Sequence, residues 1–437
     1  MTVSPEVMSS FGVAIAVAAI VGRLLTAAVM PLLTQLEVIL SQEPAGEPAA
    51  GDQRIAVVQS GAAEVLGQPQ TPARARGWGA ILPVVGWWLR DAPKPEAWRV
   101  AACVEVAAVL LGAAAWSWEV AWGMQLPRVF AEAPAALDPL QARLAAHLLL
   151  AGFLAAATWC DLRYRVIPDA ITVPGLLLGM LAVTCWPEIL LPVGCVLPVE
   201  PATALAAPDV LGFAGPLGGR APVGGLLDLR SWVGLAGLVV GFSLWWMVGT
   251  APDPSRRWYR DPRCAVWAGG VALIGITWGT APQAGVPRHL LALATSVVGA
   301  VGAGGLIVFT REAASRALGK EAMGLGDATL MAMVGSWLGW QIGVVAFFVA
   351  AFLGLAHGLL GWLWRRESEL AFGPSLCLAT VIVLAGWRWV WAWVEPIFLQ
   401  PFDLLFVLGA VVGLTGITLA VWSRLRGDGP AEGDERS

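Results

Sequence analysis

The sequence predicts an all-α, polytopic helical membrane protein with about 11 membrane segments, one of them short or re-entrant. Of its 437 residues, 57% are hydrophobic and only 13% are charged. Soluble domains carry about 25% charged residues, so this composition is typical of a membrane protein. The hydrophobic residues also gather in runs that approach the roughly 20 residues needed to cross a bilayer. Helices are the expected form, because backbone polar groups in lipid must be satisfied within the segment.

The apolar runs divide the chain into eleven candidate segments. In order they are 9–33, 98–120, 143–160, 170–187, 232–250, 264–281, 289–309, 328–338, 341–363, 374–394 and 402–423. The first has no basic stretch before it and is too long for a signal peptide, so we interpret it as a retained membrane helix. The eighth is too short for a full span and fits a re-entrant or tilted helix.

Positive charges orient the segments. With eleven spans, the main clusters share one face of the membrane, which we expect to be cytoplasmic. The N-terminus would then lie outside and the C-terminus in the cytoplasm. The clusters are Arg163 and Arg165; Arg256, Arg257, Arg260 and Arg263; Arg311, Arg316 and Lys320; Arg365 and Arg366; and Arg424 and Arg426.

Several classes of function are disfavoured by the residues present. The net charge of −4 gives no sign of a nucleic-acid partner. The six cysteines form no CxxC pair, and the three histidines are far apart without an HExxH motif. We therefore expect no metal site and interpret the histidines as packed or interfacial residues.

Asp161 is the first of two acidic residues that lie at the ends of apolar segments. A carboxylate there costs free energy, so its presence indicates a function. It follows the run 143–160 directly. Its alternative role is that of an interfacial charge paired with Arg163 or Arg165. Further on, Pro168 and Asp169 are typical of a helix start, so Asp169 is interpreted as a capping residue.

Asp327 is the second such residue and closes the sequence Gly324-Leu325-Gly326-Asp327 before the run 328–338. The two glycines allow backbone angles and close approaches that a side chain would block. They would place Asp327 at the N-terminus of the next helix, where N–H groups favour an ionised carboxylate. The alternative is an ordinary Gly-rich loop with a capping aspartate. If brought together, the two aspartates could share one proton and activate water, as in aspartic proteases.

At these residues the chain resembles the type IV prepilin leader peptidases, a family of GxGD membrane aspartic peptidases. The resemblance lies in the pattern D-x-R-x-x-x-I-P-D over 161–169 and in the stretch 321–327, followed by Ser-Trp-Leu-Gly at 336–339. The Phe-Gly-Pro sequence at 372–374 is similar to the family segment that opens a late helix.

This resemblance implies an aspartic endopeptidase, a hydrolase with Asp161 and Asp327 as the catalytic pair. Its substrates would be pilin or pseudopilin precursors of a type IV pilus or a protein secretion system. Their short basic leaders would be removed at the cytoplasmic boundary of the inner membrane, with the lipid bilayer as the other partner. The supporting motif residues would be Gly324, Gly326, Arg163 and Pro168.

Three departures from the family pattern stand out. Family members commonly carry two CxxC pairs in the first cytoplasmic loop, and this chain has none. The segment 22–31 replaces the Asn and Arg of a family pattern that accompanies N-methyltransferase activity. Thr329 stands where the family often has Lys. We therefore expect cleavage to need no cofactor and N-methylation from S-adenosylmethionine to be weak or absent.

The domain organisation follows from the same comparison. Residues 1–125 are interpreted as a degenerate N-terminal region with a cytoplasmic loop at 34–97. Residues 143–365 form the aspartic peptidase domain with an expanded middle, which includes a Pro- and Gly-rich loop at 188–231. Residues 366–437 add C-terminal helices and a disordered tail.

Two other functions stay open from the sequence, and one residue has two interpretations. The chain could be an inactive scaffold of a pilus or secretion system, or a proton-coupled transporter with both aspartates as proton carriers. Glu105, within an apolar segment, is either half of a structural ion pair or a substrate or cofactor contact.

Overall fold

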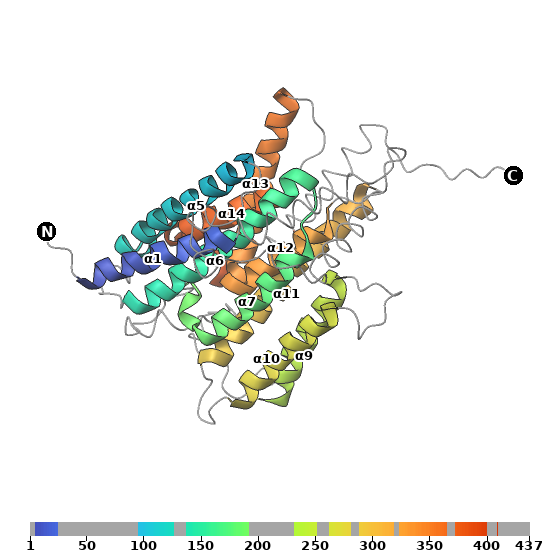
Figure 1. Cartoon of the computed structure of the whole chain (residues 1–437). Helices are drawn as coiled ribbons and strands as arrows, with labels where there is room; N and C mark the ends of the chain where they lie inside the picture. Colours follow the sequence, from blue (N-terminus) through green and yellow to red (C-terminus); the bar gives the residue numbers. More distant parts are fainter. Residues whose placement is uncertain are drawn as a thin grey trace.

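The computed structural model describes residues 5–24, 95–125, 137–191, 231–250, 262–280, 288–318, 323–364 and 372–399, with the single residue 409. Every element in these ranges is helical (Figure 1). The predicted loops at 34–97 and 188–231, the segment 402–423 and the tail lie mostly outside them. The predicted class, a polytopic helical membrane protein, is confirmed.

The helices follow the predicted segments closely. They are α1 (Pro5–Leu24), α5 (Pro95–Trp116), the π-helix η3 (Ser117–Ala121), α6 (Leu137–Tyr164), α7 (Asp169–Cys185), the 3₁₀ turn η5 (Pro187–Ile189), α9 (Trp232–Thr250), α10 (Pro262–Thr280), α11 (Arg288–Leu318), α12 (Leu325–Leu338), α13 (Trp340–Trp364), α14 (Gly373–Ala385) and α15 (Trp387–Leu399). Among the described residues, three helices are long and apolar enough to cross a membrane, or four if α14 and α15 count as one bent span.

The predicted segment at 374–394 is divided into two helices. α14 and α15 meet at an angle of 90° beside Gly386. α14 ends there, where the Gly386 N–H donates to the Ile382 carbonyl at 2.8 Å. α15 buries Trp387 and Trp391 on one face and exposes Trp393 on another. α15 therefore has one buried face and one exposed face, and it turns away from α14 instead of extending it. The average hydrophobicity of the run does not distinguish a bent pair of helices from one straight helix.

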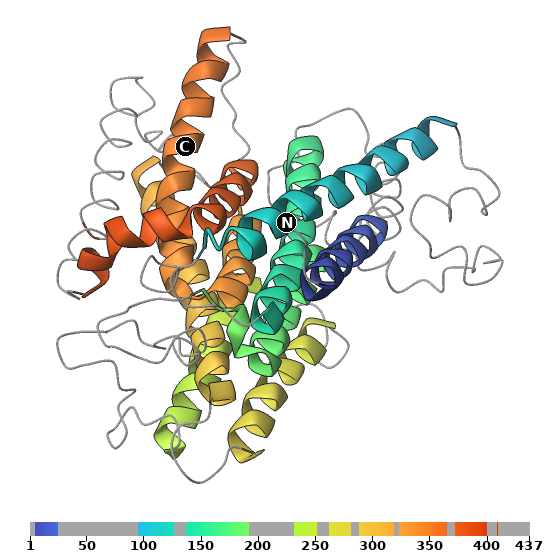
Figure 2. The ribbon, with the colours of Figure 1, turned by 90° about the vertical axis from the view of Figure 1, so that its left-hand side faces the viewer.

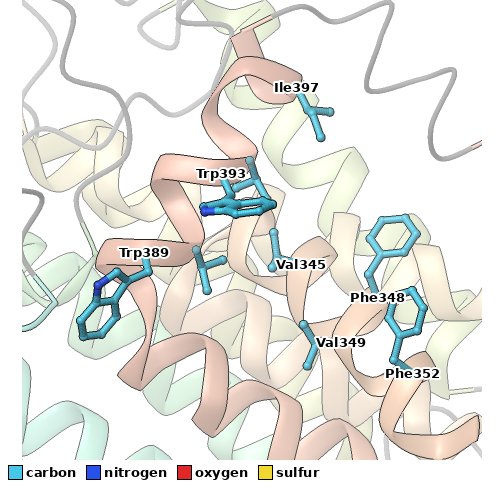
Figure 3. Close-up of a pocket in the computed structure, with 9 residues that line it drawn as sticks. Val345, Phe348, Val349, Phe352, Trp389, Trp393 and Ile397 are labelled. Carbon is cyan, nitrogen blue, oxygen red and sulfur yellow. The ribbon is translucent and has the colours of Figure 1, made fainter.

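α15 leaves an apolar pocket of about 530 Å³ between itself and α13 (Figure 3). It is lined by Val345, Phe348, Val349, Phe352, Trp389, Val390, Trp393, Val394 and Ile397. No acidic side chain takes part, so this pocket is separate from the two aspartates.

α12 is the central helix of the bundle. Every residue from Asp327 to Leu338 is buried, beneath α7, α11, α13 and α14. α11 approaches it most closely, where a Cβ added to Gly299 or Gly335 would collide with the carbonyl of the other. Small residues allow membrane helices to pack this tightly. The short eighth segment is therefore an inner helix enclosed by the protein.

α1 and α5 pack together beside α6, whereas α9 and α10 lie on the opposite side of the bundle (Figures 1 and 2). Arg23 of α1 donates to Glu105 of α5 at 3.1 Å, and both side chains are buried. The ion pair agrees with the structural interpretation of Glu105.

Candidate active site: two neighbouring aspartates

Asp161 lies in the last turn of α6, where its side chain is buried. The backbone N–H of Gly373, at the start of α14, donates a hydrogen bond to its carboxylate. The Oδ2 atom, by contrast, has no hydrogen-bond partner among the described residues. A Cβ at position 373 would collide with this oxygen, so only glycine lets the backbone come so close.

The chain reverses direction at Arg165, immediately after α6 ends at Tyr164. The Arg165 N–H donates to the Asp161 carbonyl at 2.8 Å, and Arg165 takes the left-handed conformation with φ 56°. Pro168, and not Asp169, occupies the N-cap position of α7, without a side-chain capping hydrogen bond. Asp169 lies in the first turn, as predicted, where its negative charge suits the helix N-terminus. This reversal brings the start of α7 alongside the end of α6.

The two arginines of this motif lie on the exposed surface. The positive charge of Arg165 acts on Asp161, and the alternative interpretation of Asp161 as the partner of an arginine stays a prediction. Asp161 is nevertheless buried, and its surroundings include a second carboxylate as well as an arginine.

Asp327 is that second carboxylate, in the first turn of α12, and is also buried. The Gly324 N–H donates a hydrogen bond to it. Gly326 presses on the segment that follows Asp161, because a Cβ there would lie 3.0 Å from the Ile167 carbonyl oxygen. Sequence reasoning predicted a steric need for both glycines. It holds at Gly326 but not at Gly324, where the nearest atom would be 3.9 Å away.

The two aspartates are close enough to interact electrostatically. The charge of Asp161 acts on Asp327, and both charges act on the buried thiol of Cys377, one turn into α14. The end of α6 and the starts of α12 and α14 therefore converge. Two such carboxylates can share one proton, and the ionised member can act as a base towards water. The pair titrates as a unit, so neither residue has a separately assigned role.

Sequence reasoning gave Gly373 no role in this site, which it built from Asp161, Asp327, Gly324, Gly326, Arg163 and Pro168. The available signal was the Gly-Pro pair before an apolar run, which resembles a helix start without showing what that start contacts. Within the part of the chain that the structure describes, no group of three His, Cys, Asp or Glu side chains could hold a metal ion.

Comparison with known proteins gives a family match and several similar relatives. The type IV leader peptidase family matches residues 264–359, which include Asp327. A "Prepilin leader peptidase/N-methyltransferase" of Dickeya chrysanthemi is 40% identical over 107 residues, 22% of this chain and 36% of the relative. Proteins of the same name are 46% identical over 68 residues in Pectobacterium carotovorum subsp. carotovorum (15% of this chain, 24% of the relative) and 34% over 73 residues in Escherichia coli (strain K12) (16% and 32%).

The chain spans about a third of the length of the first of these relatives. No solved structure matches it. The segment that carries the Gly-x-Gly-Asp sequence and the central helix α12 is nevertheless the segment that the family comparison identifies. Residues 264–359 of this chain are therefore similar to the type IV leader peptidase family.

Proposed function

We propose that this protein is a membrane aspartic endopeptidase that removes the short basic leader from type IV prepilins or pseudopilins. The observation that carries the proposal is the pair of buried, interacting carboxylates of Asp161 and Asp327. One protonated and one ionised aspartate supply a general acid and a general base for peptide hydrolysis. The names of the relatives, prepilin leader peptidase/N-methyltransferase, support the choice of substrate.

In the reaction, the ionised aspartate accepts a proton from water as that water attacks the scissile carbonyl carbon. The protonated aspartate donates a hydrogen bond to the oxygen of this carbonyl, and it later transfers its proton to the nitrogen of the leaving amine. The Asp161 Oδ2 atom, which lacks a partner among the described residues, is available for the attacking water. The N–H groups of Gly373 and Gly324 hold the two carboxylates while their protonation changes.

The position of the site relative to the membrane is part of the proposal. The arginine distribution favours a site at the cytoplasmic boundary, with the N-terminus outside and the C-terminus inside. The peptidase unit would extend past residue 365 to include α14, because Gly373 contacts Asp161. The segment 22–31, on which the expectation of weak or absent N-methylation depends, lies outside the described residues from position 25 onward.

The test is cleavage of a pilin-like precursor in membranes by the Asp161→Asn and Asp327→Asn variants. Each change keeps the size of the side chain and removes its acid–base function, so each should lower the rate by at least about 10²-fold. Membrane insertion and melting temperature should stay close to those of the wild type. Full cleavage by either variant would remove the paired-aspartate mechanism. Lack of cleavage by the wild type would favour the scaffold or the transporter.

A further inference from the structure

A second set of contacts joins the segments that carry the two aspartates, and it involves neither carboxylate. Thr172, in the first turn of α7, donates its hydroxyl hydrogen to the hydroxyl oxygen of Thr329 on α12 at 3.0 Å. Thr329 in turn donates to the carbonyl of Gly326 at 3.0 Å. Both threonines are buried, with 0% and 2% of their surface exposed. Each hydroxyl has only one hydrogen, and this arrangement uses both.

These bonds close a ring of contacts. Gly326 packs against the backbone of Ile167, and Pro168 and the start of α7 lead from Ile167 to Thr172. Thr172 connects through Thr329 back to Gly326, the residue immediately before Asp327. Asp161 is joined to the same ring through the reversal at Arg165. The ring therefore fixes the segment that follows Asp161 against the loop that precedes Asp327.

We propose that Thr172 and Thr329 are positioning residues that set the separation of the two aspartates. This inference rests on the proposed peptidase function. Neither threonine touches the reacting atoms in this role. Their hydroxyls hold the Gly326 carbonyl, and so the first turn of α12, in the orientation that points Asp327 towards Asp161. A buried hydrogen bond between helices suits this purpose, since leaving either end unpaired away from water is costly.

The two threonines should differ in importance, because Thr329 takes part in both hydrogen bonds and Thr172 in only one. Thr329→Val keeps the shape of the side chain and breaks both bonds, so kcat should fall about tenfold with KM unchanged, as for misplaced catalytic groups. Thr172→Val breaks one bond and leaves the Thr329–Gly326 bond intact, so the loss should be smaller. The double variant should match Thr329→Val alone, because the second change removes a bond that is already lost.

Two controls separate positioning from general damage. Thr184→Val removes another buried hydroxyl of α7, whose one hydrogen bond among the described residues is to the Met180 carbonyl of the same helix, and should leave kcat unchanged. Thr329→Ser retains the hydroxyl and should restore most of the kcat. Losses that simply add in the double variant, a change confined to KM, or an equal loss in Thr184→Val would each overturn the proposal.

A readout independent of cleavage distinguishes this inference from the proposed function. Amide hydrogen exchange in the first turn of α12 should speed up in Thr329→Val and stay unchanged in Thr184→Val. If the wild type cleaves no pilin-like precursor but the exchange rates behave in this way, the peptidase proposal fails and the ring stands. If cleavage is normal and exchange is unchanged in Thr329→Val, the ring fails and the peptidase proposal stands.

Discussion

Two regions of α6, separated by 14 residues or about 21 Å along the helix, bury carboxylates in opposite ways. At one end, Asp161 interacts with a second carboxylate and has an oxygen without a partner among the described residues. At the other, both oxygens of Glu119 lie within hydrogen-bond reach of His147 Nδ1, at 3.0 and 3.1 Å. α14 reaches both regions, since Gly373 contacts Asp161 while Trp118, beside Glu119, donates to the Ala385 carbonyl at 2.8 Å.

The contrast shows which buried acids are candidates for chemistry. Glu119 has a basic partner within contact distance, so its burial is compensated and its role is to join η3 to α6. Asp161 and Asp327 place like charges together, which opposes folding when both are ionised. A protein keeps such an arrangement when it serves a function. Burial alone, common to all three acids, does not make this distinction.

The largest expected difference between the two regions is in activity. Asp327→Asn should lower the cleavage rate by about 10²- to 10⁴-fold, whereas Glu119→Gln should change this rate only a few-fold. Stability should respond in the opposite sense. Glu119→Gln weakens a buried hydrogen-bonded pair at a cost of about 1–3 kcal/mol, while Asp327→Asn removes a repulsion and costs little. The measurements are cleavage rates and melting curves in detergent. Equal losses of stability in both variants would contradict the comparison.

The next effect concerns the two glycines of the Asp327 loop. Gly326→Ala should lower the cleavage rate by up to about 10²-fold, because its Cβ would press on the Ile167 carbonyl and displace Asp327. Gly324→Ala should be nearly neutral, since its Cβ has room and its N–H remains available to Asp327. Both variants are measured in the same precursor-cleavage assay. A Gly324→Ala variant as impaired as Gly326→Ala would show that the loop needs a glycine for a reason other than space.

The buried ion pair of the N-terminal helices offers a third comparison. Arg23→Met should destabilise the fold by about 3–5 kcal/mol, because Glu105 would lose a buried cationic partner. The double variant with Glu105→Leu should recover much of this loss, and cleavage should stay within a few-fold of the wild type. Thermal unfolding of the single and double variants measures the interaction free energy between Arg23 and Glu105. A large loss of cleavage in a well-folded double variant would return Glu105 to the class of substrate or cofactor contacts.

The smallest expected effect is that of a metal chelator, which should leave cleavage unchanged. The sequence has no CxxC pair, and the reaction proposed for the two aspartates needs no metal. The check is activity before and after exhaustive chelation, with zinc added back. Activity lost to the chelator and restored by zinc would reveal a metal site elsewhere in the chain.

Much of the fold could be predicted from the sequence, because membrane helices follow from apolar length. The predicted segments coincide with α1, α5, α6, α7 and α9 to α13 over the described residues. The bend at Gly386 was missed because the run 374–394 is apolar except for Arg388 and a few small polar residues, so hydrophobicity does not report a change of direction. The candidate pair was predicted from two short motifs, but the contact of Gly373 with Asp161 was not, because 212 positions separate the two residues in sequence.

The sequence by itself determined the membrane class, the order of the helices and the two aspartates at helix ends, because these depend on local composition and on motifs read in order. Only the tertiary structure decided how the buried polar groups are partnered. It placed Asp161 beside Asp327 and Glu119 beside His147, and it linked Thr172 to Thr329. The physical reason is that a buried polar group depends for its stability on whichever groups packing brings within hydrogen-bond reach, and those lie on other helices.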